Sequence, residues 1–223
     1  MRHSGVLNIL IDSFPKILVP GLLMTIPLTV VSFAIALVIA VLTAMVQFAN
    51  VKGLKQLARF YIWVVRGTPL LVQLYMVFYG LPKLGILLEP IPASIIVFSL
   101  NYGAYAAETV RGALEAVPVG QMEAGYCVGM SWFQIMRRIV LPQAMRMAFP
   151  SLSNELISLV KDTSLAANIT VAEMFMAAQR IVARTYEPLL LYAEVGVIYL
   201  AFSTFFTWGQ RKLEERMDAM DSE

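Results

Sequence analysis

The sequence predicts an all-α integral membrane protein with about five transmembrane helices, and two observations lead to this fold class. The chain of 223 residues is 59% hydrophobic and only 14% charged, with a mean hydropathy of +0.71, which lies outside the range of soluble globular proteins. In addition, residues 17–51 contain no charged side chain. This stretch exceeds the roughly 20 residues that a spanning helix needs. It is also too long for the apolar core, about 7 to 15 residues, of a cleaved signal peptide.

Apolar stretches recur along the whole chain, and each predicts one spanning helix. The five expected spans cover residues 20–48, 60–79, 92–110, 148–172 and 189–208. Prolines in the first two spans argue against straight helices, although membrane helices tolerate proline where neighbouring groups satisfy the freed carbonyls. The sequence contains no internal repeat, so we expect residues 1–223 to form a single transmembrane domain.

Basic residues are divided unevenly between the two sides of this arrangement. One side has ten: Lys52, Lys55, Arg59, Arg111, Arg137, Arg138, Arg146, Arg211, Lys212 and Arg216. The other side has five: Arg2, Lys16, Lys83, Arg180 and Arg184. Because cytoplasmic loops are enriched in Lys and Arg, we expect the first side to be cytoplasmic. The N-terminus is then outside and the C-terminus inside.

The residue inventory argues against several chemical roles. The basic residues are spread between apolar blocks rather than gathered in one patch, so nucleic acid is not an expected partner. A single cysteine, Cys127, and a single histidine, His3, predict neither a disulfide within the chain nor a metal site. The sequence has no glycine-rich lysine loop for nucleotide phosphates, so we expect no ATP hydrolysis and no cofactor on this chain.

A polar hairpin of two short helices is predicted between the third and fourth spans, over residues 118–142. Gly129 is suited to a left-handed stop after the first helix. Ser131 and Gln134 form a capping-box pattern that starts the second helix, which we expect to end near Pro142. Two interpretations remain open from these residues alone: an amphipathic hairpin on the lipid headgroups, or a knob on which another protein docks.

The chain resembles the permease subunits of bacterial ABC importers, first of all in this hairpin. The hairpin motif is Glu123-Ala124-Gly125, then Gly129, then Ile139-Val140-Leu141-Pro142. Further motifs are similar to the polar amino acid branch of that family: Arg66-Gly67-Thr68-Pro69-Leu70, Asn101-Tyr102-Gly103-Ala104-Tyr105-Ala106-Ala107-Glu108, Leu141-Pro142-Gln143-Ala144 and Lys161-Asp162-Thr163-Ser164-Leu165. One departure is Gly125, where the family has alanine. Because glycine weakens a helix by roughly 1 kcal/mol relative to alanine, we expect a looser first helix.

This resemblance implies the type I ABC importer permease fold and a function. The chain would be the transmembrane permease subunit of a binding-protein-dependent importer of polar amino acids, with cystine among the candidates, in the bacterial inner membrane. The implied partners are a separate ATP-binding subunit that carries Mg-ATP, an extracytoplasmic amino-acid-binding protein, a second, identical permease subunit and the membrane lipid. The implied residues of ATPase coupling are Glu123, Ala124, Gly125, Gly129, Ser131, Ile139, Leu141 and Pro142.

Polar residues inside the expected spans are the candidates for a substrate path, because a charge in a spanning segment is costly unless it faces protein or water. Asn101, Tyr105 and Glu108 follow one another at spacings of four and three and share a helical face. Glu155 and Asp162 are seven residues apart and share another face. The complete candidate set is Asn101, Tyr105, Glu108, Glu155, Lys161, Asp162 and Thr163.

Three alternatives remain for these polar groups. Lys161 and Asp162 would pair with each other, or with neighbouring helices, only to hold the bundle together. An ion-coupled secondary amino acid transporter would use Glu108, Glu155, Asp162 and Glu194 as proton or sodium sites, and it predicts two related halves, which the sequence lacks. A membrane enzyme would have only one histidine and one cysteine for catalysis, so no enzymatic activity is expected.

Overall fold

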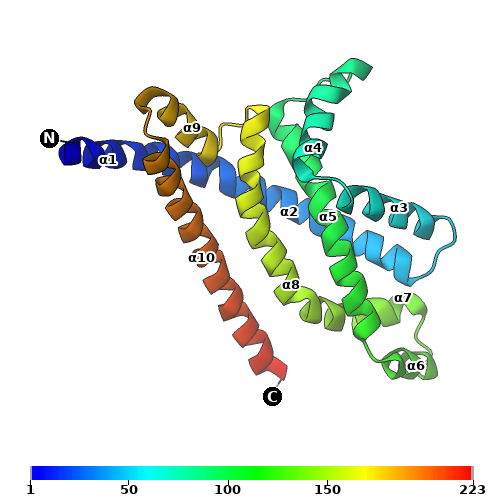
Figure 1. The fold of residues 1–223 in the computed structure, drawn as a ribbon. Coiled ribbons are helices and arrows are strands. Elements are labelled where there is room, and N and C mark those ends of the chain that lie inside the picture. The colour runs from blue at the N-terminus through cyan, green and yellow to red at the C-terminus, as the bar shows by residue number, and fades with distance from the viewer. Residues whose placement is uncertain (1, 222–223) are drawn as a thin grey trace.

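The computed structural model describes residues 2–221, and within that range the chain forms ten α-helices and five short π or 3-10 helices, with no strand (Figure 1). The all-α prediction is therefore confirmed. In chain order the elements are α1 (Arg2–Pro20), η1 (Gly21–Thr25), α2 (Ile26–Phe48), α3 (Leu54–Arg66), α4 (Leu70–Tyr75), η2 (Met76–Gly80), η3 (Leu81–Leu84), α5 (Pro90–Ala116), α6 (Val119–Cys127), α7 (Trp132–Ile135), η4 (Met136–Val140), α8 (Leu141–Asp162), η5 (Thr163–Ile169), α9 (Met174–Thr185) and α10 (Pro188–Asp221).

Two long helical runs are apolar enough to cross a bilayer by length and composition. One covers Leu7–Phe48, 42 residues, in which the π turn η1 joins α1 to α2 without a break. The other covers Pro188–Met217 in α10. Helices α5 and α8 are 27 and 22 residues long. They have the length to span about 30 Å of hydrocarbon, but they carry more polar groups. Helical segments thus lie at all five predicted positions.

The second predicted span is not one helix over residues 60–79. It consists of α3 and the segment Leu70–Leu84, which meet at an angle of 103°. Pro69 has no amide hydrogen and keeps Thr68 out of the helical region, so the helix must end there. The side-chain amide of Gln73 then donates to the freed carbonyl of Val65 at 2.8 Å and to that of Thr68 at 3.1 Å. The sequence indicates a bend here, but the bend angle is set by the tertiary structure.

The fourth and fifth predicted spans also have other boundaries. The helix expected over 148–172 begins earlier, at the start of α8, and ends at Asp162, where η5 tightens the chain into a 3-10 helix. Thr170 then has a left-handed conformation, φ 68°, which closes that segment. The helix expected over 189–208 is α10, which has 34 residues and continues well beyond the predicted end.

Small residues determine how closely the central helices pack. Ala36, Ala40 and Ala44 repeat every four residues on α2 and are fully buried in the core that α2 shares with α5. On α5, a Cβ atom added at Gly103 would lie 2.9 Å from the side chain of Ile39. In a membrane, helix association is driven by van der Waals packing rather than by the hydrophobic effect. Small residues at this spacing let the helix backbones approach closely. Helices α2, α5 and α8 thereby form the closely packed centre of the bundle.

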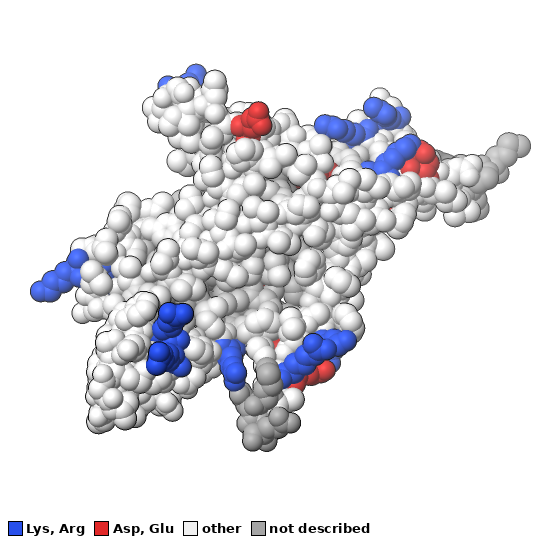
Figure 2. Space-filling view, turned by 180° about the vertical axis from the view of Figure 1, so that it is seen from behind, with Lys and Arg blue, Asp and Glu red and all other residues white. Residues whose placement is uncertain are grey.

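A second, smaller core joins α1 to α9 and to the first half of α10. It consists of Ile17 from α1, Met174 and Ala178 from α9, and Val195 and Ile198 from α10. The N-terminus, α9 and the start of α10 lie together at one end of the molecule, whereas the hairpin α6–α7 and the C-terminus lie at the other (Figure 1). Charged groups on the rear face lie mainly toward the edges, with a wide uncharged region between them (Figure 2). Such an uncharged band fits a lipid environment.

Candidate functional site

A polar cavity of about 610 Å³ lies where the bend between α3 and α4 meets α5 and α8. It is lined by Arg66, Gly67, Thr68, Pro69, Leu70, Asn101, Tyr102, Tyr105, Asn154, Glu155, Ser158 and Asp162. The cavity exists because the 103° bend turns α4 away and exposes the end of α3 to the neighbouring helices. Four residues of the predicted substrate path, Asn101, Tyr105, Glu155 and Asp162, therefore share one space.

The two carboxylates of this cavity are held in different ways. Tyr102 donates its hydroxyl to Asp162 Oδ2 at 2.7 Å, which orients that carboxylate. Thr109 donates to Glu155 Oε1 at 2.8 Å. The second oxygen, Oε2 of Glu155, is buried and has no hydrogen-bond partner among the described residues. A buried acceptor without a partner is costly, by about 1 to 3 kcal/mol or more for a charged group, so a ligand donor that reached this oxygen would remove that cost.

A cation lies in the same cavity. The guanidinium of Arg66 lies 5.0 Å from the centroid of the Tyr105 ring, a cation–π contact. The side chain of Asn101 is held in turn by Gln73, whose amide oxygen accepts from Asn101 Nδ2 at 3.1 Å. In the sequence Arg66 stands out only as part of a family motif, and neither Arg66 nor Gln73 was among the predicted residues of the substrate path. The Arg66-Gly67-Thr68-Pro69 motif draws attention to this segment of the chain, but only the tertiary fold places the segment beside α5.

Three other predicted path residues lie outside this cavity. Glu108 is one turn further along α5, where Arg111 Nη2 contacts its Oε2 at 2.9 Å, and it borders a separate pocket with Gln47 and Arg59. Lys161 is exposed and makes no ion pair with Asp162 among the described residues. Thr163 is fully buried, and its hydroxyl donates to the carbonyl of Val160 at 2.7 Å. A shared helical face did not ensure a shared cavity.

The hairpin has the helix signals that its sequence predicts. Gly129 has φ +78°, and the amides of Gly129 and Met130 donate to the carbonyls of Tyr126 and Gly125, both at 3.0 Å. This pair of bonds closes α6 as a Schellman motif. Ser131 Oγ accepts from the amide of Gln134, and the Gln134 side chain accepts from the amide of Ser131 at 2.8 Å. The predicted glycine stop and capping box are thus both present.

Two hairpin expectations are wrong. The second helix does not end near Pro142, because the π turn η4 passes directly into α8, and Pro142 is the second residue of α8. Helix α7, η4 and α8 therefore form one continuous helical run. Nor is Gly125 a loosening substitution. It is buried, and an added Cβ would lie 2.7 Å from Ile135 Cγ1, so the missing side chain permits close packing of the two hairpin helices.

The hairpin presents an apolar surface to its surroundings. Val128 and Phe133 are 77% and 61% exposed, and Val119 and Tyr126 are also exposed. Glu123 is exposed beside them. Of the remaining candidates, Ala124, Ser131 and Pro142 are exposed, whereas Ile139 and Leu141 are half-buried. An apolar patch at the turn of a polar hairpin is typical of an interaction site.

An all-helical membrane bundle with a polar cavity and a protruding hairpin defines a transmembrane transport component. Residues 36–219 match the family described as "Binding-protein-dependent transport system inner membrane component". The chain therefore belongs to this family of inner-membrane transport components, as the sequence resemblance indicated.

Known relatives and solved structures agree with this assignment. The chain is 44% identical over 208 residues to the L-cystine transport system permease protein TcyB of Bacillus subtilis (strain 168), covering 93% of this chain and 89% of that protein. It is 38% identical to the nopaline transport system permease protein NocM of Agrobacterium fabrum (strain C58 / ATCC 33970), covering 89% and 86%.

Among solved structures, a chain from "Crystal structure of an amino acid ABC transporter with histidines" superposes with a TM-score of 0.85 at 32% identity, covering 92% of this chain and 96% of that one. An inward-facing MetNI methionine ABC transporter chain superposes with a TM-score of 0.76 at 19% identity, covering 90% and 95%. The type I ABC importer permease fold is thereby confirmed.

Proposed function

We propose that this chain is the permease subunit of an ABC importer of polar amino acids, and that cystine is its first candidate substrate. The observation that carries this proposal is the cavity with Arg66, Glu155 and Asp162. A zwitterionic amino acid needs a cation for its carboxylate and a carboxylate for its ammonium group, and this cavity offers both. Its volume of about 610 Å³ is within the range of small-molecule sites.

Similarity to two cystine permeases supports the choice of substrate. Besides TcyB, the L-cystine transport system permease protein TcyL of Bacillus subtilis is 36% identical over 215 residues. Cystine has two ammonium and two carboxylate groups, one of each on either side of its disulfide, so its two ammonium groups match in number the two carboxylates of the cavity. The free Oε2 atom of Glu155 is the first acceptor that we assign to an ammonium group.

The hairpin is the proposed docking site for a separate ATPase subunit, which carries Mg-ATP. Its apolar patch, Val128 and Phe133 above all, enters a groove on that subunit. Because α7, η4 and α8 are continuous, movement of the hairpin is transmitted to α8, which carries Glu155 and Asp162. ATP-driven motion of the partner thus reaches the cavity through a single helical run.

The remaining parts of the system complete the proposal. An extracytoplasmic binding protein delivers the amino acid, and a second copy of this chain closes the pathway. The N-terminus lies outside and the C-terminus lies in the cytoplasm, on the side of the hairpin. The uneven distribution of basic residues supports this orientation.

Transport by the reconstituted system tests the proposal. The chain is placed in proteoliposomes with its cognate ATPase and binding protein from the same organism, and uptake of radiolabelled cystine is measured. We expect uptake to need both ATP and the binding protein, and unlabelled cystine to compete better than histidine, glutamine or arginine. Uptake driven by a proton or sodium gradient without ATP would contradict the permease role. Stronger competition by another amino acid would contradict only the substrate.

A further inference from the structure

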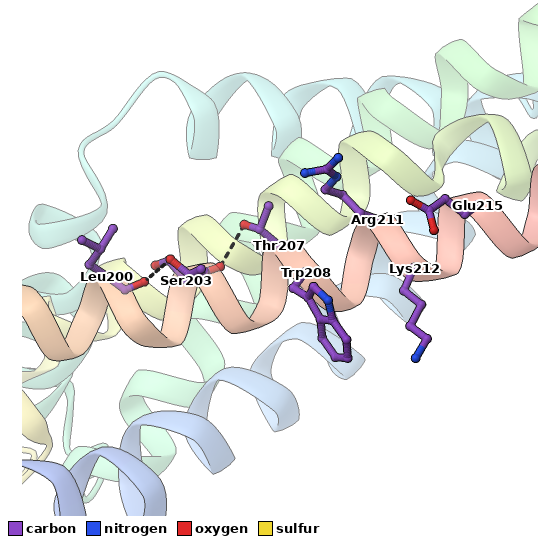
Figure 3. A pocket seen from close by; sticks show the side chains of 8 residues that line it. Leu200, Ser203, Thr207, Trp208, Arg211, Lys212 and Glu215 are labelled. Atoms are coloured by element: carbon purple, nitrogen blue, oxygen red, sulfur yellow. Dashed lines mark hydrogen bonds between the residues drawn. The ribbon is translucent and has the colours of Figure 1, made fainter.

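The C-terminal part of α10 has an open pocket that is separate from the cavity at the bend between α3 and α4. Its volume is about 790 Å³, and it is lined by Leu200, Ser203, Thr204, Thr207, Trp208, Arg211, Lys212 and Glu215 (Figure 3). These residues recur at spacings of three and four, so they form one face of the helix. The face is apolar at Leu200, carries hydroxyl groups in the middle and is charged from Arg211 onward.

The position of this pocket along α10 corresponds to a membrane surface. Trp208 is twenty residues beyond Pro188, the first residue of the helix. At 1.5 Å per residue the helix has risen about 30 Å there, which is the thickness of the hydrocarbon core. Tryptophan is enriched at this level. Arg211 and Lys212 follow within one turn, so they reach headgroup depth.

The polar groups of this face differ in whether they already have a hydrogen-bond or ion-pair partner. Thr204 and Thr207 donate to the carbonyls of Leu200 and Ser203 at 2.7 and 2.8 Å, so their hydroxyl groups need no outside partner. Lys212 Nζ lies 5.0 Å from the centroid of the Trp208 ring. Neither Arg211 nor Lys212 makes an ion pair with any described side chain. Two cations are thus left for an external anion.

Trp208 and Lys212 project together from one edge of α10, while Arg211 projects from the other (Figure 3). The two cations therefore lie on opposite sides of this helix face. Trp208 is 58% exposed, which leaves its ring free to contact an acyl ester region. This face has the charge to attract a phosphate group, and its apolar end at Leu200 can contact the hydrocarbon part of the same molecule.

We propose that this face of α10 binds the headgroup of an anionic phospholipid, with Arg211 and Lys212 as the cations that attract the lipid phosphate. A second copy of this chain is a less suitable occupant, because a twofold contact through the same face would bring like charges together. A free phosphate ion would not use Trp208 or Leu200. The inference requires that α10 spans the membrane, and it is independent of which substrate is imported.

Lipid-specific quenching of Trp208 fluorescence tests this proposal. The full chain with Trp63→Phe and Trp132→Phe retains Trp208 as its only tryptophan. It is reconstituted in phosphatidylcholine vesicles that contain a small fraction of brominated phosphatidylglycerol or, separately, brominated phosphatidylcholine. Because each basic residue favours an anionic surface by a factor of about five, we expect the phosphatidylglycerol to associate at least about fivefold more strongly. Lipids retained by the wild-type chain in native mass spectrometry provide an independent measurement.

Matched variants identify the residues that are responsible. Arg211→Gln with Lys212→Gln should remove the preference, whereas Lys52→Gln with Lys83→Gln removes two cations elsewhere and should leave it intact. Glu215→Gln removes the carboxylate that borders the pocket and should increase the preference. Equal quenching by both lipids would overturn the proposal, as would loss of the preference on addition of inorganic phosphate. Protection of Trp208 from both lipids would identify a second copy of the chain as the occupant instead.

Discussion

Among single residues, the acidic side chains of the expected spans fall into two kinds that the sequence does not distinguish: those that face the cavity and those that do not. Glu108, Glu155 and Asp162 are all acidic residues in expected spans, yet Glu108 is paired with Arg111, whereas Glu155 and Asp162 face the cavity. A charge in a spanning segment costs about 2.5 to 3.5 kcal/mol, so each of the three must be compensated. Only Glu155 and Asp162, which line the cavity, are also available to pair with a charged group of the substrate.

Removing the charge of the cavity carboxylates should therefore impair transport selectively. We expect Glu155→Gln and Asp162→Asn to reduce uptake by about tenfold each, because a charge-assisted bond to an ammonium group is worth about 1.5 to 3 kcal/mol. ATP hydrolysis stimulated by the binding protein should persist. Glu108→Gln is the matched control, and it should leave substrate preference unchanged. A changed preference in Glu108→Gln with normal uptake in the other two would refute the assignment.

Gly125 offers a second test at this scale. In Gly125→Ala the new methyl group would lie 2.7 Å from Ile135 Cγ1. Overpacking of this kind costs typically 1 to 3 kcal/mol, so the hairpin should open and become sensitive to protease. Combining it with Ile135→Ala creates space for the methyl group and should restore part of the resistance. If Gly125→Ala is as resistant as the wild type, the two hairpin helices are not packed so closely.

At the scale of elements, the bend between α3 and α4 creates the cavity, and a single side chain bridges it. Gln73 donates to Val65, to the carbonyl of Thr68 and to its hydroxyl, and accepts from Asn101. Without Gln73, the carbonyls of Val65 and Thr68 would lose these donors. Gln73 is thus a positioning residue for the wall of the cavity.

Gln73→Leu has nearly the same volume and removes all four of these bonds. We expect the thermal midpoint of the detergent-solubilised chain to fall by several degrees, because each net hydrogen bond contributes about 0.5 to 1.5 kcal/mol. Uptake should fall with it. Gln73→Glu keeps the acceptor for Asn101 but loses the donor, so its midpoint should be equally reduced if the bend depends on donation. A midpoint of Gln73→Glu close to that of the wild type would instead place the stabilisation in the contact with Asn101.

At the scale of the whole molecule, the hairpin and the cavity are connected by the run from α7 through η4 to α8. We expect Val128→Asp with Phe133→Asp to leave the chain folded in the membrane but to abolish stimulation of the partner ATPase, because two charges would enter an apolar interface. Leu84→Asp, which changes an equally exposed apolar residue in η3, is the control and should not affect stimulation. Normal stimulation of the doubly substituted complex would remove this patch from the docking surface.

Composition and short-range sequence patterns were sufficient to predict the membrane class, the helical fold, the hairpin with its glycine stop and capping box, and the family. These features depend on composition and on contacts within a few residues, such as the bonds that close α6 and start α7. The arrangement of the helices in space was needed to show that Arg66 joins Glu155 and Asp162 in one cavity, that Glu108 lies outside it, and that α7 continues into α8. Helical periodicity indicates which residues share a face. It does not specify the angle at which the next helix crosses that face, and this angle, 103° at the bend, decides which side chains meet.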